Sequence, residues 1–259
     1  MRMAERNKRM KSVILSLKES GENNRLVKVI SAENGIFNAM LYGGPKSRLK
    51  SLVQPFYSGI LYIYSDESRN SIKITDFDAQ NCHLSFRTSL LKSWAASFAC
   101  ELVLKTKCAG ETEKAFVLLC AFLDGIDSVD ENEARLGILR FVWRYLGLLG
   151  LQPEPRTCCG CGSSLLSHEH NASYIERQNG FVCADCISFA PENRTQGNFR
   201  IDLDSLTYLT AINELPPGQV RKLLVPSESV YNMKRLLYSM IEKACGMQLE
   251  TLKSGIGIL

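Results

Sequence analysis

The pattern that most limits how this chain can fold is a set of four cysteines in two closely spaced pairs. Cys158 and Cys161 form one Cys-x-x-Cys pair, and Cys183 and Cys186 form the second. The interval between the pairs is close to the ~15–20 residues typical of two-pair zinc sites. Two tight turns of this kind present four thiolates to one tetrahedral ion, with Zn–S bonds of ~2.3 Å. We therefore assign Cys158, Cys161, Cys183 and Cys186 as the ligands of one structural Zn²⁺.

The segment around these cysteines, residues 157–188, contains few large apolar side chains. A segment this short does not bury enough surface to fold alone, so a bound metal would stabilise it. Gly180-Phe181-Val182 suits a strand that enters the second turn. Cys159 does not fit the two-residue gap, and we treat it as a spare thiol. The other five cysteines lie in strand or helix patterns and are expected to be core or surface thiols: Cys82, Cys100, Cys108, Cys120 and Cys245.

Two enzymatic interpretations of the cysteines are disfavoured, and we expect no enzyme. A catalytic zinc keeps an open position beside three protein ligands, whereas four cysteines close the shell. A zinc deaminase also needs His-x-Glu and then Pro-Cys-x-x-Cys, but His168-Glu169-His170 has another order and Val182 precedes Cys183. His168 and His170 are expected to be solvated. A Cys-x-x-Cys redox protein is the other alternative, and the second pair at zinc spacing argues against it.

The chain from about Met10 to Gln80 alternates short β-type runs with turn signals. Asn34-Gly35 between two such runs is a strong hairpin signal. Five short strands in one small region suit an OB-type barrel. The expected strands are Val13–Leu17, Leu26–Ser31, Ile36–Leu41, Gly59–Tyr64 and Ile72–Thr75.

Most of the remaining chain has helical periodicity. Leu90, Trp94 and Phe98 recur every four residues on one helix face. Pro153 and Pro155 are expected to end the third helix. The expected helices are Thr88–Lys105, Glu111–Leu123, Glu131–Leu149, Leu203–Leu215, Val220–Leu224 and Ser227–Cys245.

These patterns together predict an α+β multidomain chain. It consists of an N-terminal OB-fold β-barrel, a helical C-terminal domain and an inserted zinc-finger module with four cysteine ligands. The expected boundaries are 1–80 for the barrel, 81–156 with 189–259 for the helical domain, and 157–188 for the zinc module.

The modest net charge of +4 hides an uneven distribution. Residues 1–80 hold 13 lysines and arginines against 8 acids, a net charge of +5. No acid occurs between Glu33 and Asp66, and a glycine-led segment in that window carries Lys46, Arg48 and Lys50. Cations beside a glycine turn suit phosphate contacts. The candidate nucleic-acid contacts of this basic region are Lys11, Arg25, Lys46, Arg48 and Lys50.

Aromatic side chains near these cations offer two interpretations. Phe37, Tyr42, Phe56 and Tyr57 could stack on unpaired bases or fill the barrel core, and the core is favoured for Phe56. In the last long helix, Lys234, Arg235 and Lys243 are candidate contacts to DNA or to a protein partner, or else form a solvated helix face.

The order of these segments resembles the RecO family of bacterial recombination mediators. The N-terminal similarity lies in Glu22-Asn23-Asn24-Arg25-Leu26-Val27, Glu33-Asn34-Gly35, Lys46-Ser47-Arg48 and Leu52-Val53-Gln54-Pro55-Phe56. Both cysteine pairs, Arg235-Leu236-Leu237 and Leu252-Lys253-Ser254 continue it, so it spans nearly the whole chain. Asn24 stands where the family usually has an acid, and Gly43-Gly44-Pro45 replaces a more basic run.

The resemblance implies a role in DNA repair and homologous recombination through the RecF pathway. It implies binding of single- and double-stranded DNA and annealing of complementary strands. The implied partners are RecR and single-stranded-DNA-binding protein, and together they let RecA load onto covered strands. The main alternative is a zinc-stabilised adaptor or regulatory protein without direct DNA binding, and the acid-free window between Glu33 and Asp66 argues against it.

The expected location is the cytoplasm, in association with the nucleoid. The apolar run Val13-Ile14-Leu15 stops at Ser16, short of the ~7–15 apolar residues of a signal peptide. The run Ala115–Leu123 is far shorter than the ~20 residues that cross a bilayer. We therefore expect no membrane partner.

Overall fold

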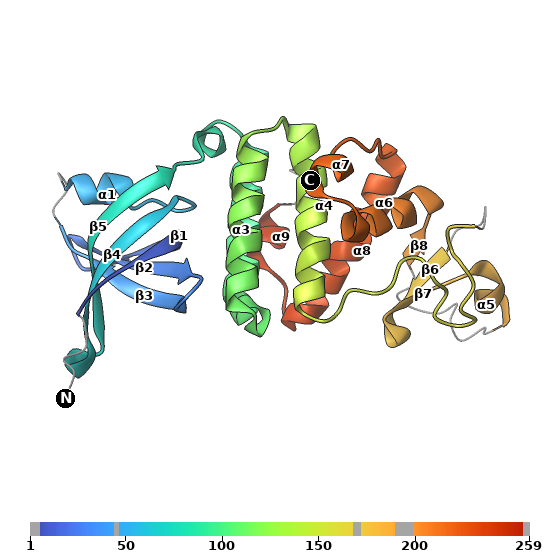
Figure 1. Cartoon of the computed structure of the whole chain (residues 1–259), viewed down its shortest axis with the longest axis horizontal. Coiled ribbons are helices and arrows are strands. Elements are labelled where there is room, and N and C mark those ends of the chain that lie inside the picture. Colours follow the sequence, from blue (N-terminus) through green and yellow to red (C-terminus); the bar gives the residue numbers. More distant parts are fainter. Residues whose placement is uncertain (1–5, 44–46, 168–171, 190–198, 256–259) are drawn as a thin grey trace. The chain divides into compact units, whose positions relative to one another are not determined.

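The computed structural model describes residues 6–43, 47–167, 172–189 and 199–255 (Figure 1). The chain divides into two compact units. Unit 1 comprises Met1–Ala134 and Leu249–Leu259, and unit 2 comprises Arg135–Gln248. In the described ranges, no helix is both long and apolar enough to cross a membrane.

A closed five-stranded barrel forms the first part of unit 1, which confirms the predicted OB-type barrel. The strand order is β1-β2-β3-β5-β4, with β3 and β5 parallel and the other pairs antiparallel. Closure removes the exposed sheet edges. The strands are β1 (Asn7–Ser20), β2 (Asn24–Ser31), β3 (Gly35–Leu41), β4 (Ser58–Asp66) and β5 (Ser71–Asn81).

The barrel core follows the alternation of strand residues between two faces. Val27 and Val29 of β2 point inward and pack with Leu61 and Phe77. The short helix α1 (Arg48–Leu52), between β3 and β4, packs Leu49 and other apolar side chains against this core. The predicted hairpin joins β2 to β3, where Gly35 adopts a φ of 65°.

Apart from α1 and one short turn, the helices of unit 1 follow the barrel in the chain. Ser89 caps α2 by accepting a hydrogen bond from the Lys92 backbone N–H, as N-cap serines commonly do. The single turn α9 packs on α2, because Trp94 Nε1 donates to the Thr251 carbonyl at 2.7 Å. These elements are η2 (Leu84–Arg87), α2 (Leu90–Lys105), η3 (Lys107–Gly110), α3 (Thr112–Asp127) and α9 (Glu250–Ser254), with η1 (Glu67–Arg69) between β4 and β5.

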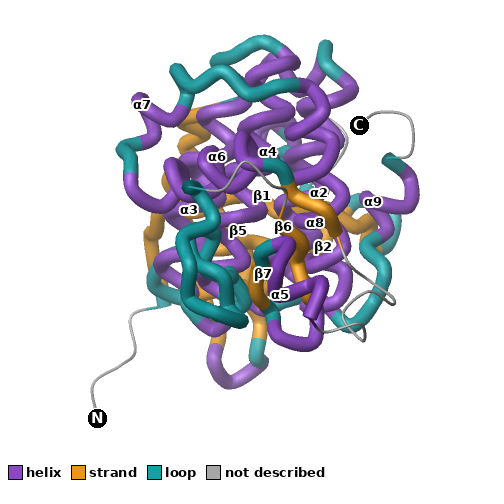
Figure 2. The backbone as a smooth tube through the Cα atoms, turned by 90° about the vertical axis from the view of Figure 1, so that its right-hand side faces the viewer, coloured by secondary structure: helices purple, strands orange, loops and turns teal. Residues whose placement is uncertain are grey.

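Unit 2 combines helices with a small sheet. Helix α4 (Glu131–Leu148) begins at the end of unit 1 and continues into unit 2. The three-stranded sheet has the order β7-β6-β8, and Figure 2 shows α5 beside β6 and β7. The elements are β6 (Ala172–Ile175), η4 (Glu176–Gln178), β7 (Gly180–Val182), α5 (Ala184–Phe189), β8 (Phe199–Ile201), α6 (Leu203–Glu214), α7 (Pro217–Val220) and α8 (Ser227–Cys245).

Two details of the helical prediction are wrong. The turn is helical at Pro217–Val220 and not at Val220–Leu224, because a proline is well tolerated in the first turn of a helix. Helix α4 ends before Pro153 and Pro155. Gly150 adopts a φ of 70°, and the Leu151 N–H donates to the Leu146 carbonyl at 2.9 Å, which closes a glycine C-cap.

Asp202 joins α6 to α8 in unit 2. Its carboxylate accepts hydrogen bonds from the backbone and hydroxyl of Ser205, from the Ser229 hydroxyl and from the Asn232 amide, at 2.8 to 3.2 Å. Burial acts to raise the pKa of Asp202, but these hydrogen bonds favour the carboxylate more strongly and lower the pKa below its usual value. The charged form therefore stabilises the folded state.

We expect Asp202→Ala to lower the free energy of unfolding at pH 7 by about 1–2 kcal/mol, the cost of a lost N-cap. Because the folded-state pKa is lowered, this stabilisation is present above the unfolded pKa and is lost as pH falls below about 4. Urea unfolding at pH 7 and pH 3 measures the difference between wild type and variant. The difference should shrink at pH 3, and an equal difference at both pH values would contradict the prediction.

Candidate metal centre and nucleic-acid surface

Two turns carry the four cysteines of the predicted metal site. In the first turn, the Gly162 N–H donates to the Cys158 carbonyl at 2.8 Å, and Gly162 adopts a φ of 76°. A side chain is strained at this angle, which explains the glycine. In the second turn, β7 ends at Val182 and α5 starts at Ala184, so Cys183 precedes the helix and Cys186 lies in its first turn.

These turns bring the four sulfurs into one cluster. The Sγ atoms of Cys158, Cys161, Cys183 and Cys186 all lie within 4.8 Å of one another, and Cys161 Sγ is 3.8 Å from Cys183 Sγ. A tetrahedral ion with bonds of ~2.3 Å separates its sulfur ligands by ~3.8 Å. A Cβ on Gly160 would lie 3.2 Å from Cys186 Sγ, so the glycine leaves room for the fourth sulfur. The cluster can hold a metal ion without further ligands.

The electrostatics of the cluster also suit a cation. Hydrogen bonds from Ser163 and from neighbouring thiols lower the pKa of Cys161 to about 6. Hydrogen bonding with Cys161 and Cys183, together with burial, raises the pKa of Cys186. Cys161 and Cys186 thus resist simultaneous ionisation unless a positive ion balances their charge.

Cys159 stands apart from the cluster. Its thiol is 3.2 Å from Gln178 Oε1, and its backbone N–H donates to the Phe181 carbonyl at 2.9 Å. The prediction of a spare thiol agrees with this position. His168 and His170 lie outside the described residues.

The predicted cations of the barrel lie on more than one surface. Arg48 is exposed and Lys50 half-buried, both on α1, while Lys46 lies outside the described residues. Arg25 is half-buried on β2, opposite Leu41. Lys11 is exposed on β1 near α3, where burial and Asp124 raise the pKa of Cys120 to about 12 and Lys11 opposes them. Figure 1 shows α1 on the side of the barrel away from α3, so Lys11 does not join the α1 cations.

The predicted aromatic side chains have different surroundings. Tyr57 is buried, and Phe37 packs against the barrel core. Tyr42 is 47% exposed, and Lys73 Nζ lies 5.6 Å from the centre of its ring. Phe56 is half-buried, with its ring edge-on to Phe86 at 6.1 Å. Tyr42 is therefore the most exposed aromatic of this set.

The predicted cations of α8 separate into two groups. Lys234 Nζ and the Arg235 guanidinium lie 5.5 and 5.7 Å from the ring centre of Tyr231, which is 53% exposed. Such cation–π contacts leave the cations at the surface. Lys243 instead forms an ion pair with Glu176. Lys234 and Arg235 thus present an aromatic–basic surface, whereas the charge of Lys243 is balanced locally.

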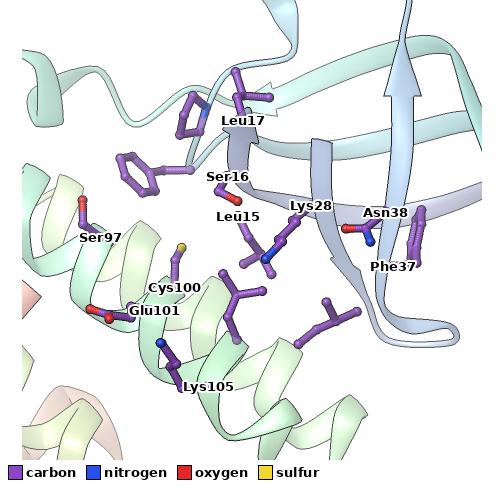
Figure 3. Close-up of a pocket in the computed structure, with 14 residues that line it drawn as sticks. Leu15, Ser16, Leu17, Lys28, Phe37, Asn38, Ser97, Cys100, Glu101 and Lys105 are labelled. Atoms are coloured by element: carbon purple, nitrogen blue, oxygen red, sulfur yellow. The ribbon is translucent and has the colours of Figure 1, made fainter. Parts of the chain in front are cut away.

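The structure also reveals a pocket that the sequence analysis did not predict. It lies in unit 1 between the barrel and α2, has a volume of about 680 Å³, and is lined in part by Lys28 and Asn38 (Figure 3). Strand alternation could have predicted that Lys28 faces outward, because it stands between the inward-facing Val27 and Val29. Its helical wall, however, comes from residues far along the chain.

Two family models match this chain. The family model described as "Recombination protein O N terminal" matches residues 3–80, and the model described as "Recombination protein O C terminal" matches residues 87–253. The barrel and the region that carries the cysteine cluster are thus those of a recombination protein. The chain belongs to the RecO family, which confirms the resemblance seen in the sequence and supports a role in DNA repair.

Curated relatives cover most of the chain. A protein named DNA repair protein RecO from Oceanobacillus iheyensis is 23% identical over 247 residues, which cover 93% of this chain and 90% of the relative. The protein of the same name from Syntrophotalea carbinolica is 28% identical over 182 residues, 68% of each chain. That from Synechococcus elongatus is 23% identical over 239 residues, 90% of this chain and 85% of the relative.

Proposed function

We propose that this protein is a DNA-repair mediator that binds single- and double-stranded DNA and anneals complementary strands. The observation that carries the proposal is the match of both RecO family models, in order, to a chain whose N-terminal part is a closed OB-type barrel. Barrels of this type often bind oligonucleotides. The exposed Arg48 and the half-buried Lys50 of α1 supply positive charge for phosphates.

Annealing of this kind requires no covalent chemistry. Two polyanionic strands approach each other when lysines and arginines neutralise their phosphates and release counterions. The protein's role is then to bind, to hold strands close together and to release the duplex. We propose that it does so in the cytoplasm at the nucleoid, with RecR and single-stranded-DNA-binding protein as partners, and that RecA then loads onto the exposed strand.

We propose that the metal of the four-cysteine cluster is one structural Zn²⁺. Four thiolates in a tetrahedral arrangement are a common donor set for zinc, and they leave no open coordination position. The ion would hold the turn at Cys158–Cys161 against the start of α5 and so stabilise the small sheet of unit 2.

A strand-annealing assay across salt concentrations tests the function. We expect the protein to accelerate annealing of complementary oligonucleotides at low salt, and the acceleration to fall steeply between about 50 and about 200 mM salt, by about 10³-fold in affinity if about six phosphates are contacted. The assay is run with bare strands and with strands covered by single-stranded-DNA-binding protein. Absence of annealing and of DNA binding in both would favour the adaptor alternative.

A further inference from the structure

The pocket between the outer face of the barrel and α2 has no role in the function described so far. Its volume of about 680 Å³ falls within the ~300–1,000 Å³ of small-ligand sites. Strands β1, β2 and β3 form one wall, and α2 forms the opposite wall (Figure 3). The pocket is therefore a groove between a sheet and a helix.

The sheet wall carries a polar row across three strands. Lys28 pairs in register with Ser16 on one side and with Asn38 on the other. Lys28 and Asn38 are both exposed. Figure 3 shows Lys28 extending from its strand toward α2, whereas the ring of Phe37 lies on the other side of its strand. The row thus offers one cation and one carboxamide to the groove.

The helical wall adds a second cation and a carboxylate that is already engaged. Lys105 and Glu101 both line the groove from α2. Glu101 accepts hydrogen bonds from the backbone N–H groups of Glu250 and Thr251 and from the Thr251 hydroxyl, at 2.6 to 3.0 Å. Figure 3 shows its carboxylate turned away from the barrel. Its charge faces the amino end of α9 and not Lys28.

Phe56 supplies an aromatic ring at the groove in an unusual backbone conformation. Its φ is 70°, which is rare and costly for a residue with a bulky side chain. Its N–H donates to the Ile14 carbonyl at 2.8 Å, and its carbonyl lies 2.8 Å from His83 Nδ1. These two bonds fix the backbone of Phe56, and the residue lines the groove.

We propose that this groove binds one unpaired nucleotide of single-stranded DNA, an inference that rests on the proposed function. Lys28 contacts a phosphate, and the Asn38 carboxamide, which both donates and accepts, bonds the free edge of the base. The base packs against Phe56. In a duplex the base edge is already paired and the base is stacked, so the groove favours single strands.

Two variants separate the phosphate contact from the base contact. Lys28→Ala should flatten the slope of log K against log salt by about 0.7, the value for one phosphate contact to a single strand. Asn38→Ala should weaken single-strand binding about fivefold, as expected for one hydrogen bond, without changing that slope. Neither variant should change affinity for a duplex of equal length by more than about twofold, since the groove excludes paired bases.

Fluorescence anisotropy with a labelled oligo(dT) of about 30 nucleotides and with the matching blunt duplex measures both quantities. Lys114→Ala is the matched control, because Lys114 is an exposed lysine of α3 that is paired with Glu111 and does not line the groove. It removes the same charge and should leave single-strand binding unchanged. Circular dichroism and thermal melting establish that all three variants fold as the wild type does.

The failures of the groove and of the proposed function are distinguishable. If the wild type binds neither probe, the proposed function and the groove assignment are both wrong. If the wild type binds DNA, and the Lys28 and Asn38 variants change nothing or weaken single strands and duplex equally, only the groove assignment is wrong. A short acidic peptide that binds the wild type but not Lys28→Ala, with oligo(dT) binding unaffected, would reassign the groove to a protein partner.

Discussion

Replacing Cys183 by serine is expected to release the metal and unfold the small sheet of unit 2. A serine hydroxyl is a poor zinc ligand at neutral pH, whereas the thiolate of Cys183 completes the four-sulfur shell. Structural zinc contributes about 10–16 kcal/mol of apparent binding free energy to small modules of this kind. Strands β6, β7 and β8 are only three or four residues long, so their own backbone hydrogen bonds add little to the stability that the metal supplies. We expect one zinc per chain in the wild type, none in the variant, and a lower melting temperature.

Cys159→Ser is the control. It makes the same cysteine-to-serine change next to the ligand Cys158, in the first of the two turns. The Cys159 thiol lies 3.2 Å from Gln178 Oε1 and is outside the sulfur cluster. This variant should keep its zinc and its melting temperature. Metal content by mass spectrometry and melting by circular dichroism give the comparison. Retention of zinc in Cys183→Ser, or its loss in Cys159→Ser, would show that the ligand assignment is wrong.

Local patterns were sufficient to predict the barrel and the cysteine cluster. The polar Lys28 separates the inward-facing Val27 and Val29, and Asn34-Gly35 fixes the hairpin between β2 and β3. Strand positions therefore follow from neighbouring residues. The cysteine pairs likewise carry their own spacing. Both features depend on residues that lie close together in the chain, so the sequence alone predicts them.

The groove was not predictable, because it depends on contacts between distant segments. The register of β1 shifts between Ile14 and Ser16, and such a bulge re-aims the side chains beside it. The conformation of Phe56 depends on Ile14 and His83, which lie on either side of it in the chain. The same limit applied to the cations, because counting charges along the chain grouped Lys11 with Arg48. In the structure Lys11 lies near α3, whereas Arg48 is on α1, on the side of the barrel away from α3.

Replacing Lys46, Arg48 and Lys50 together by alanine is expected to have the largest effect on DNA binding. If all three contact phosphates of a single strand, the slope of log K against log salt should fall by about 2, at about 0.7 per contact. The loss should extend to duplex DNA, because phosphate contacts carry no sequence or pairing information. This distinguishes Lys46, Arg48 and Lys50 from the groove, where Lys28→Ala should affect single strands alone.

The matched control removes three cations that already have acidic partners. Arg69, Lys114 and Arg156 pair with Asp66, Glu111 and Glu154, and their replacement by alanine changes the net charge by the same amount. A general effect of net charge would weaken binding equally in both triple variants. A direct contact would weaken binding only in the variant of Lys46, Arg48 and Lys50. The factor would grow as salt is lowered, since each lost phosphate contact reduces the salt dependence. If the triple replacement of Lys46, Arg48 and Lys50 left DNA binding unchanged, the phosphate site would lie elsewhere. Lys234 and Arg235 beside the exposed Tyr231 would then be the next cations to replace.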